Sequence, residues 1–169
     1  MRWNRRRWLG TLLLAAPIGS GVFWWSESRS VATDPAIRLE VSLSARELRV
    51  VAEGSTVAAY GIAVGRPGHR TPTGTFSTGN IVWNPSWTPP PTDWAANKTY
   101  QPPGAAANPM QGVKIYFQAP YYFIHGTNNP DSIGEAASHG CIRMVAEDAI
   151  ALARRIERAG GSVPLIISP

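Results

Sequence analysis

Cys141 is the single cysteine of this 169-residue sequence, and it lies in the segment ASHGCIRM at residues 137–144. A thiol is a strong nucleophile only as a thiolate, and a free cysteine is only slightly ionised at neutral pH. A neighbouring imidazole can remove its proton. An unpaired cysteine between a histidine–glycine pair and an arginine therefore indicates a catalytic nucleophile.

Three histidines could activate this thiol: His69, His125 and His139. His125 ends the segment YYFIH, whose β-branched and aromatic residues are typical of a strand. The segment that follows can bring the chain back toward Cys141. We expect His125 to be the general base and to form an imidazolium–thiolate pair with Cys141. The alternative is a strand-end histidine that only bonds a nearby carbonyl group.

The segment SHGC at residues 138–141 predicts a tight turn just before a helix. Gly140 permits backbone angles that other residues resist, and a helix start favours negative charge. We expect the backbone N–H groups of His139 and Gly140 to form an oxyanion hole. Arg143 adds a cation within reach of a substrate carboxylate, although an ordinary structural salt bridge is the alternative.

Alternating and β-rich segments predict the elements that position these groups. We expect an antiparallel meander over 37–43, 46–53 and 56–65, a structured loop over 66–76, and strands over 113–117, 121–125 and 162–168. One clear helix is expected over 145–161, with an apolar stripe of Val145, Ala149, Leu152, Ile156 and Ala159. The pattern indicates a mainly β fold with one helix near the C-terminus.

Residues 80–110 show no period and are rich in Pro, Trp and Asn. A loop of this length in a compact domain is usually functional or disordered. Three tryptophans, Trp83, Trp87 and Trp94, favour packing. We therefore expect an ordered, Pro/Trp-rich loop that forms one wall of an active-site cleft.

Residues 1–29 combine a basic start with an apolar run from 8 to 25, which predicts either a cleaved signal peptide or an inner-membrane anchor. The pair Arg5-Arg6 allows twin-arginine export as well as the Sec route. Either reading places the protein in the periplasm or cell envelope. Residues 30–35 are expected to be a linker, and residues 36–169 a single domain.

Most of the formal net charge of +5 lies in residues 1–29, so the body of the chain is nearly balanced and nucleic acid is not an expected partner. His69, His125, His139 and Cys141 could in principle hold a metal ion. However, the chain has no second cysteine and no HExxH motif. We expect neither a metal nor a cofactor.

The segment IHGTNNPDSIGEAASHGCIRM resembles the signature of the L,D-transpeptidase catalytic domain, also called the YkuD-type domain. That signature is a histidine, a variable spacer, Ser/Thr-His-Gly-Cys, an aliphatic residue and Arg or Asn. Here it is matched by His125 and by the six residues from Ser138 to Arg143. The turn VGRPGHRTPTGTF and the first strand are also similar, so the resemblance covers roughly residues 36–168.

The resemblance implies a sandwich of mixed β-sheets with the active site in a cleft edged by loops. It implies peptidoglycan stem peptides as substrates, with Cys141 attacking the carbonyl of the third residue and expelling the terminal D-Ala. An amine from a second stem or from an anchored protein would resolve the thioester, whereas water would make the protein a carboxypeptidase. Besides Arg143, we expect Ser138 and Gly126 to bind substrate. A catalytically inactive wall-binding module is the non-enzyme alternative.

Overall fold

The computed structural model describes residues 36–169. The expected leader over residues 1–29 and the linker over 30–35 lie outside the described residues, so both stay predictions. Within residues 36–169, no helix has the length and hydropathy needed to cross a membrane.

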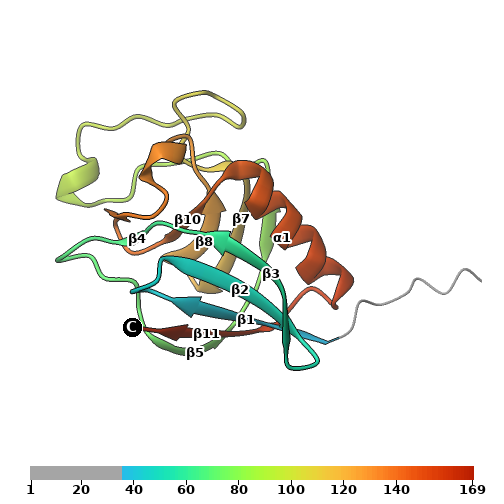
Figure 1. Ribbon diagram of the computed structural model, residues 1–169. Coiled ribbons are helices and arrows are strands. Elements are labelled where there is room, and N and C mark those ends of the chain that lie inside the picture. The colour runs from blue at the N-terminus through green and yellow to red at the C-terminus, as the bar shows by residue number, and fades with distance from the viewer. Residues whose placement is uncertain (1–35) are drawn as a thin grey trace, which may run out of the picture. The chain divides into compact units, whose positions relative to one another are not determined.

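A five-stranded mixed sheet has the strand order β3-β2-β1-β11-β5 (Figure 1). The first three strands form the predicted antiparallel meander. The last strand inserts next to β1 and runs parallel to it, with Leu165 opposite Leu39. The bounds are β1 Ile37–Ser42, β2 Glu47–Ala52, β3 Ser55–Gly61, β5 Gly74–Ser77 and β11 Pro164–Ser168.

A four-stranded mixed sheet has the order β10-β8-β7-β6. Its strands are β6 Ile81–Trp83, β7 Gln111–Gln118, β8 Tyr122–Gly126 and β10 Ile142–Met144. Strands β7 and β8 form an antiparallel hairpin whose turn contains a cis Ala119–Pro120 peptide bond. Strand β10 runs parallel to β8, which brings two segments far apart in the sequence side by side.

The strand expected over 56–65 is divided in two. Strand β3 ends at Gly61, and after buried Ile62 and Ala63 the chain forms the short β4, Val64–Gly65. There it leaves the first sheet and pairs in parallel with β9, Ala136–Ser138. Ala63 also pairs with Arg143, its N–H donating to the Arg143 carbonyl at 2.9 Å. Residues 56–65 are mostly apolar, so their pattern does not reveal that the strand changes its pairing partner from β2 to β9.

Helix α1 extends over Ala146–Arg158 and packs against β7 and β8. Its buried residues are Ala149, Leu152, Ala153 and Ile156, close to the predicted stripe. Gly160 and Gly161 follow with positive φ angles of 106° and 85°, which end the helix about three residues earlier than expected.

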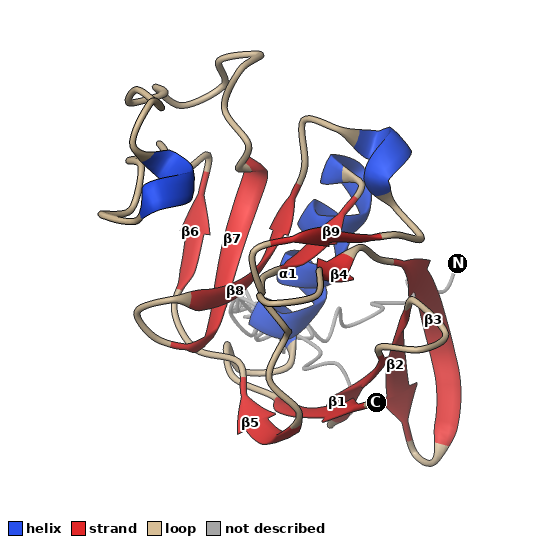
Figure 2. Ribbon diagram, turned by 90° about the vertical axis from the view of Figure 1, so that its left-hand side faces the viewer, coloured by secondary structure: helices blue, strands red, loops and turns tan. Residues whose placement is uncertain are grey.

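The core lies between the two larger sheets and the helix, and fully buried residues from each contribute to one cluster. Representative members are Leu39, Ile115, Ile124, Ile142 and Leu152. Figure 2 shows β6 and β7 on one side of this core and β2 and β3 on the other. Strand pairing and packing within the two sheets, more than packing of the single helix, therefore fix where β8 and β10 lie.

The long segment over residues 80–110 is ordered by a few specific contacts. It begins as β6, contains a short 3₁₀ turn at Asp93–Ala95, and is bridged where Trp87 pairs with Gln101. Asn108 is fully buried, and its Nδ2 donates to the carbonyl oxygens of Pro85 at 2.8 Å and Pro102 at 3.0 Å. The Asn108 side chain thereby joins distant parts of the segment, and such a contact does not require a periodic sequence pattern.

Candidate active site

Cys141 lies at the end of the SHGC turn, one residue before β10. The prediction that this turn leads directly into a helix is wrong, because β10 intervenes and α1 begins only at Ala146. Ile142 and Met144 are fully buried while Cys141 and Arg143 are partly exposed, which is the two-residue alternation of a strand. The start of α1 therefore does not lie directly at the thiol.

The parallel register of β8 and β10 brings His125 and Cys141 to one face of the sheet. His125 lies opposite Arg143, and Ile124 lies opposite Ile142. Cys141 precedes Arg143 by two positions and so projects to the same face as Arg143 and His125. The thiol itself donates to the Tyr121 carbonyl, with a distance of 3.5 Å from Sγ to the oxygen.

The hydrogen bonding of His125 determines which of its ring nitrogens can accept a proton. Its Nδ1 lies 2.9 Å from the carbonyl oxygen of Gly126. Because a carbonyl can only accept, Nδ1 must carry the hydrogen, and in the neutral ring Nε2 keeps the free lone pair. His125 thus forms the hydrogen bond to a nearby carbonyl group that is the alternative role for a histidine at a strand end. That hydrogen bond leaves Nε2 able to act as a base.

Burial favours the neutral form of both residues in the resting protein. His125 is 2% exposed, and burial lowers its pKa to about 4, assisted by the positive charges of Arg143 and Lys114. Burial raises the pKa of Cys141 to about 11, although a bond from the Phe123 backbone and the charge of Arg143 oppose the shift. Both shifts oppose the expected imidazolium–thiolate pair, because each charged form loses solvation on burial.

The turn before Cys141 is held by Ser138. Its hydroxyl donates to the Cys141 carbonyl at 2.6 Å and accepts the Gly140 N–H at 3.0 Å. Ser138 is 1% exposed and stabilises the turn, and the substrate contact expected for it stays a prediction. The Gly140 amide, expected as an oxyanion donor, is likewise already bonded within the turn.

Two glycines of the site are required by close packing. Gly140 has a φ of 112°, and a Cβ there would lie 2.7 Å from Cε1 of Tyr122. Gly126 is buried, and a Cβ there would collide with the Gln111 carbonyl and with Cα of Ala146. Gly126 thus allows β8 to pack against β7 and the start of α1, and the substrate contact expected for it stays a prediction.

The His139 side chain lies between two aromatic neighbours. Its ring stacks on Trp94 with centroids 3.8 Å apart and an interplanar angle of 14°, and it meets His69 edge to face at 4.9 Å. Burial, together with the positive charges of Arg66 and Arg143, lowers its pKa to about 4. Trp94 thereby attaches the 80–110 segment to the catalytic turn, in keeping with the ordered wall that the tryptophans indicate.

Arg143 is half-buried, and burial lowers its pKa. Its backbone is fixed by the bridge to Ala63, in which the Arg143 N–H donates to the Ala63 carbonyl at 2.8 Å. Among residues 36–169 the ion pairs join Arg38 and Arg49 to Glu40 and Glu47, and Arg143 takes part in none. The structural salt bridge considered as the alternative role for Arg143 is therefore not found in the described part of the chain.

Sequence reasoning did not assign Arg66, Trp94, Tyr121 or Tyr122 to the site. Trp94 is one of three tryptophans in the aperiodic loop that is expected to form one wall of the cleft. No sequence spacing links it to His139 in particular. The signal for Arg66 was its place in the VGRPGHRTPTGTF turn, whose similarity to the family was noted without a role. Tyr121 contributes only a carbonyl group, which no sequence pattern reveals.

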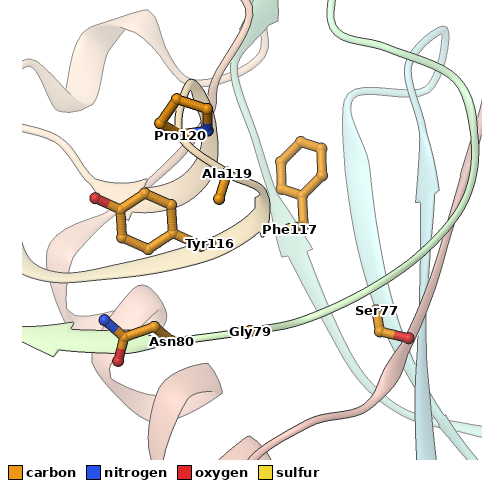
Figure 3. A pocket seen from close by; sticks show the side chains of 7 residues that line it. All are labelled: Ser77, Gly79, Asn80, Tyr116, Phe117, Ala119 and Pro120. Carbon is orange, nitrogen blue, oxygen red and sulfur yellow. The ribbon is translucent and has the colours of Figure 1, made fainter.

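A pocket of about 500 Å³ lies beside the β7–β8 turn (Figure 3). It is lined by Ser77, Gly79, Asn80, Tyr116, Phe117, Ala119 and Pro120. None of these is a predicted site residue, and the pocket is therefore distinct from the Cys141 site. The two are close along the chain, because Tyr121, which accepts the thiol hydrogen bond, directly follows Pro120. Within residues 36–169, no group of three or more His, Cys, Asp or Glu side chains is arranged to hold a metal ion.

Comparison with known proteins identifies the class of protein that this site defines. The family profile described as L,D-transpeptidase catalytic domain, or YkuD, matches residues 36–166. The YkuD protein of Bacillus licheniformis is 36% identical over 116 residues, which cover 69% of this chain and 58% of that protein. The Bacillus subtilis YkuD protein is 35% identical, over 68% of this chain and 57% of its own length. The chain thus spans less than two thirds of these relatives, whose names assign them to the L,D-transpeptidases.

Solved structures show the same fold at lower identity. L,D-transpeptidase 3 from Mycobacterium tuberculosis aligns over 80% of this chain and 62% of its own, with a TM-score of 0.62 and 18% identity. An Enterococcus faecium L,D-transpeptidase variant aligns over 79% of this chain and 50% of its own, with a TM-score of 0.59 and 17% identity. The chain belongs to the L,D-transpeptidase catalytic-domain (YkuD) family, which is a family of enzymes.

Proposed function

We propose that this protein is a cysteine-dependent L,D-transpeptidase that acts on peptidoglycan stem peptides through a Cys141 thioester. The observation that supports this most strongly is the β8–β10 register, which places the only thiol on the same face as a histidine whose Nε2 is free to accept a proton. Membership in the family supports the substrate class.

In the first half-reaction, the Cys141 thiol gives its proton to Nε2 of His125 as Sγ attacks the carbonyl carbon of the third stem residue. The tetrahedral intermediate then collapses, and the C–N bond to the terminal D-Ala breaks. The His125 imidazolium returns its proton to the departing amine, which leaves a thioester and a neutral imidazole. Moving the proton during the attack avoids a buried ion pair in the resting protein.

In the second half-reaction, an amine attacks the thioester carbonyl and His125 accepts a proton from it. The C–S bond breaks, the sulfur regains that proton from His125, and a new amide is formed. The amine belongs to a second stem or to a wall-anchored protein. With water in its place the same acyl-enzyme gives carboxypeptidase activity, so the three acceptors share one intermediate.

Backbone amides of the SHGC turn are proposed to stabilise the oxyanion, as a thioester-forming attack requires. Because Gly140 N–H is bonded to Ser138 Oγ, an oxyanion at this amide must share it with the hydroxyl. We therefore assign the larger part of this role to the His139 N–H. Arg143 is half-buried and has no ion-pair partner among residues 36–169, and it is proposed to bind a substrate carboxylate.

The reaction belongs in the cell envelope, where stem peptides occur, and export by the predicted N-terminal leader agrees with this location. A further test of the thiol comes from β-lactams. A structure of the Mycobacterium tuberculosis enzyme contains a faropenem-derived adduct. We propose that penems and carbapenems acylate Cys141 of this protein in the same manner.

The function is tested by incubating the full chain with a tetrapeptide stem, with and without an acceptor stem, and identifying the products by mass spectrometry. We expect release of the terminal D-Ala and, with the acceptor present, a cross-linked dimer. A tripeptide product without dimer would indicate the carboxypeptidase. Binding to peptidoglycan without any product would instead support the wall-binding module and reject the enzyme.

A further inference from the structure

Two arginines from separate segments lie beside the catalytic turn. Arg66 follows β4, and its backbone N–H donates to the Ser138 carbonyl at 3.0 Å, one residue before His139. Arg143 lies in β10, two residues after Cys141, and is bridged through its backbone to Ala63 near the start of β4. The segment around the short β4 thus connects through its backbone both to Ser138 of the turn and to Arg143 after it.

Electrostatic effects agree with this placement. The Arg66 charge lowers the pKa of both His139 and Arg143, and such an effect requires a short distance to each. Arg143 in turn acts on Cys141. The two permanently charged groups that act on His139 are both cations, Arg66 and Arg143.

No acidic side chain neutralises this cluster in the described structure. Arg66 and Arg143 are both half-buried, and within residues 36–169 neither has a carboxylate at ion-pair distance. Partly buried guanidinium groups lose solvation and are ordinarily paired. Arg66 acts on Arg143 and on His139 of the SHGC turn, and Arg143 acts on Cys141, so this pair of cations indicates an anion that arrives with the substrate.

His139 provides a second, independent observation. Its Nε2 is the one buried side-chain nitrogen or oxygen in residues 36–169 that has no hydrogen-bond partner. The ring cannot turn freely to find one, because Trp94 and His69 enclose it. A bound carboxylate would accept a hydrogen bond from this nitrogen in the tautomer that carries its hydrogen there.

We propose that Arg66 is a specificity-determining residue and that, together with Arg143, it binds a side-chain carboxylate on the third residue of the donor stem. This inference rests on the proposed function and names the donor class, a stem whose diamino acid carries a free carboxylate in place of an amide. Two guanidinium groups can provide charge-assisted, bidentate hydrogen bonds to such a group. A neutral amide would leave one or both cations uncompensated in the complex.

The first measurement uses the wild-type full chain and two tetrapeptides that differ only at the third residue, which is meso-diaminopimelate with either a free or an amidated side-chain carboxyl group. The two donors have nearly the same size, so only charge is varied. We expect kcat/KM for Cys141 acylation, followed by intact-mass measurement, to be at least about tenfold higher for the free acid. The ratio should fall as salt is raised, because salt screens the attraction.

Variants then separate Arg66 from a general structural effect. Arg66→Gln should lower acylation by the free acid far more than acylation by the amide, so that the ratio approaches one. Arg66→Lys should retain part of the preference. Arg70→Gln, an exposed arginine four residues along the same loop, is the matched control and should keep the full ratio. Alkylation of Cys141 by neutral iodoacetamide reports whether each variant keeps an intact site.

Three results would overturn the inference in distinguishable ways. Equal wild-type rates with both donors would reject it while leaving the proposed function in place. An Arg66→Gln variant that loses both donors equally would make Arg66 a structural residue. Acylation by neither donor in the wild type would reject the proposed function, and the inference with it.

Discussion

At the scale of single residues, the main feature is that burial favours the neutral forms of both the proposed nucleophile and the proposed base. Burial raises the pKa of Cys141 to about 11 and lowers that of His125 to about 4. A preformed ion pair would need a lowered pKa for Cys141 and a raised pKa for His125. The base can nevertheless accept a proton, because Nδ1 is committed to the Gly126 carbonyl and Nε2 is not protonated. Catalysis then depends on transferring the proton as the carbon–sulfur bond forms.

This leads to different expectations for the two site histidines. His125→Ala should reduce the acylation rate by about 10²–10⁴-fold, because the general base is lost. His139→Ala should be milder, because its backbone N–H remains, although Trp94 loses its stacking partner. The rates of both variants and of the wild type should be measured over a pH range that extends below the pKa of His125, about 4, and up to that of Cys141, about 11.

The shape of the wild-type profile follows from the same two pKa values. Acylation should increase as pH rises through about 4, where His125 becomes neutral, and should not wait for the thiol to ionise. His125→Ala should recover only at strongly alkaline pH, because the pKa of Cys141 is near 11. A greater loss in His139→Ala, accompanied by that alkaline shift, would reverse the two assignments.

At the scale of elements, the catalytic turn depends on Gly140 in two ways. Its φ of 112° is unfavourable for any residue with a side chain, and a Cβ would meet the Tyr122 ring. We expect Gly140→Ala to reduce acylation at least about tenfold, because a displacement near 1 Å at the nucleophile can cost about 10²-fold in rate.

Gly134→Ala is the matched control for this substitution. Its φ is also positive, at 93°, but a Cβ there would meet nothing within 4 Å. It should cost about 1–2 kcal/mol of unfolding free energy from backbone strain and leave the acylation rate of the folded protein nearly unchanged. Equal acylation losses in the two variants would show that strain alone, and not crowding by Tyr122, controls the turn.

The strands and the helix also show which parts of the fold sequence patterns can predict. The meander and the helix were predictable because Ile37, Leu39 and Val41 alternate and because the helix stripe repeats at helical spacing. The pairing of β10 with β8 and of β11 with β1 was not, since parallel register depends on contacts between distant segments. A three-residue strand such as β10 is too short to show a period, and the turn was therefore predicted to precede a helix directly.

The same distinction applies to the site. Residue type and motif were sufficient to propose Cys141 and His125 as the reacting groups, and the β8–β10 register brings them to one sheet face. The stacking of Trp94 on His139 and the engagement of Ser138 within the turn could not be predicted, because both depend on the path of irregular segments. The pKa shifts that favour the neutral forms of Cys141 and His125 likewise depend on burial, which residue types alone do not reveal.

At the scale of the whole molecule, the buried neutral histidine couples the active site to acid stability. The pKa of His125 is about 4 in the folded protein and 6.5 as its ordinary value, so between these values the unfolded chain binds more protons. The unfolding free energy should therefore decrease as pH falls from 6.5 to 4. The expected contribution of His125 is about 3 kcal/mol, because each pKa unit corresponds to about 1.4 kcal/mol.

Urea unfolding at several pH values tests this prediction, with His125→Asn as the comparison. The variant lacks the titrating ring, so its stability should depend less steeply on pH over this window. His139, whose pKa is also lowered, remains in both proteins and cancels in the comparison. Identical pH slopes for the two proteins would contradict a buried neutral His125.

The most direct test of the proposed chemistry is the intact mass of the protein during reaction with a tetrapeptide stem. The thioester mechanism predicts an increase in protein mass equal to the mass of the tetrapeptide minus that of one molecule of D-alanine, and peptide mapping should locate the adduct at Cys141. Cys141→Ala should remain folded and form no adduct, because the sequence contains no other thiol. Normal release of D-Ala by Cys141→Ala, or an adduct on any other residue, would contradict the thioester mechanism.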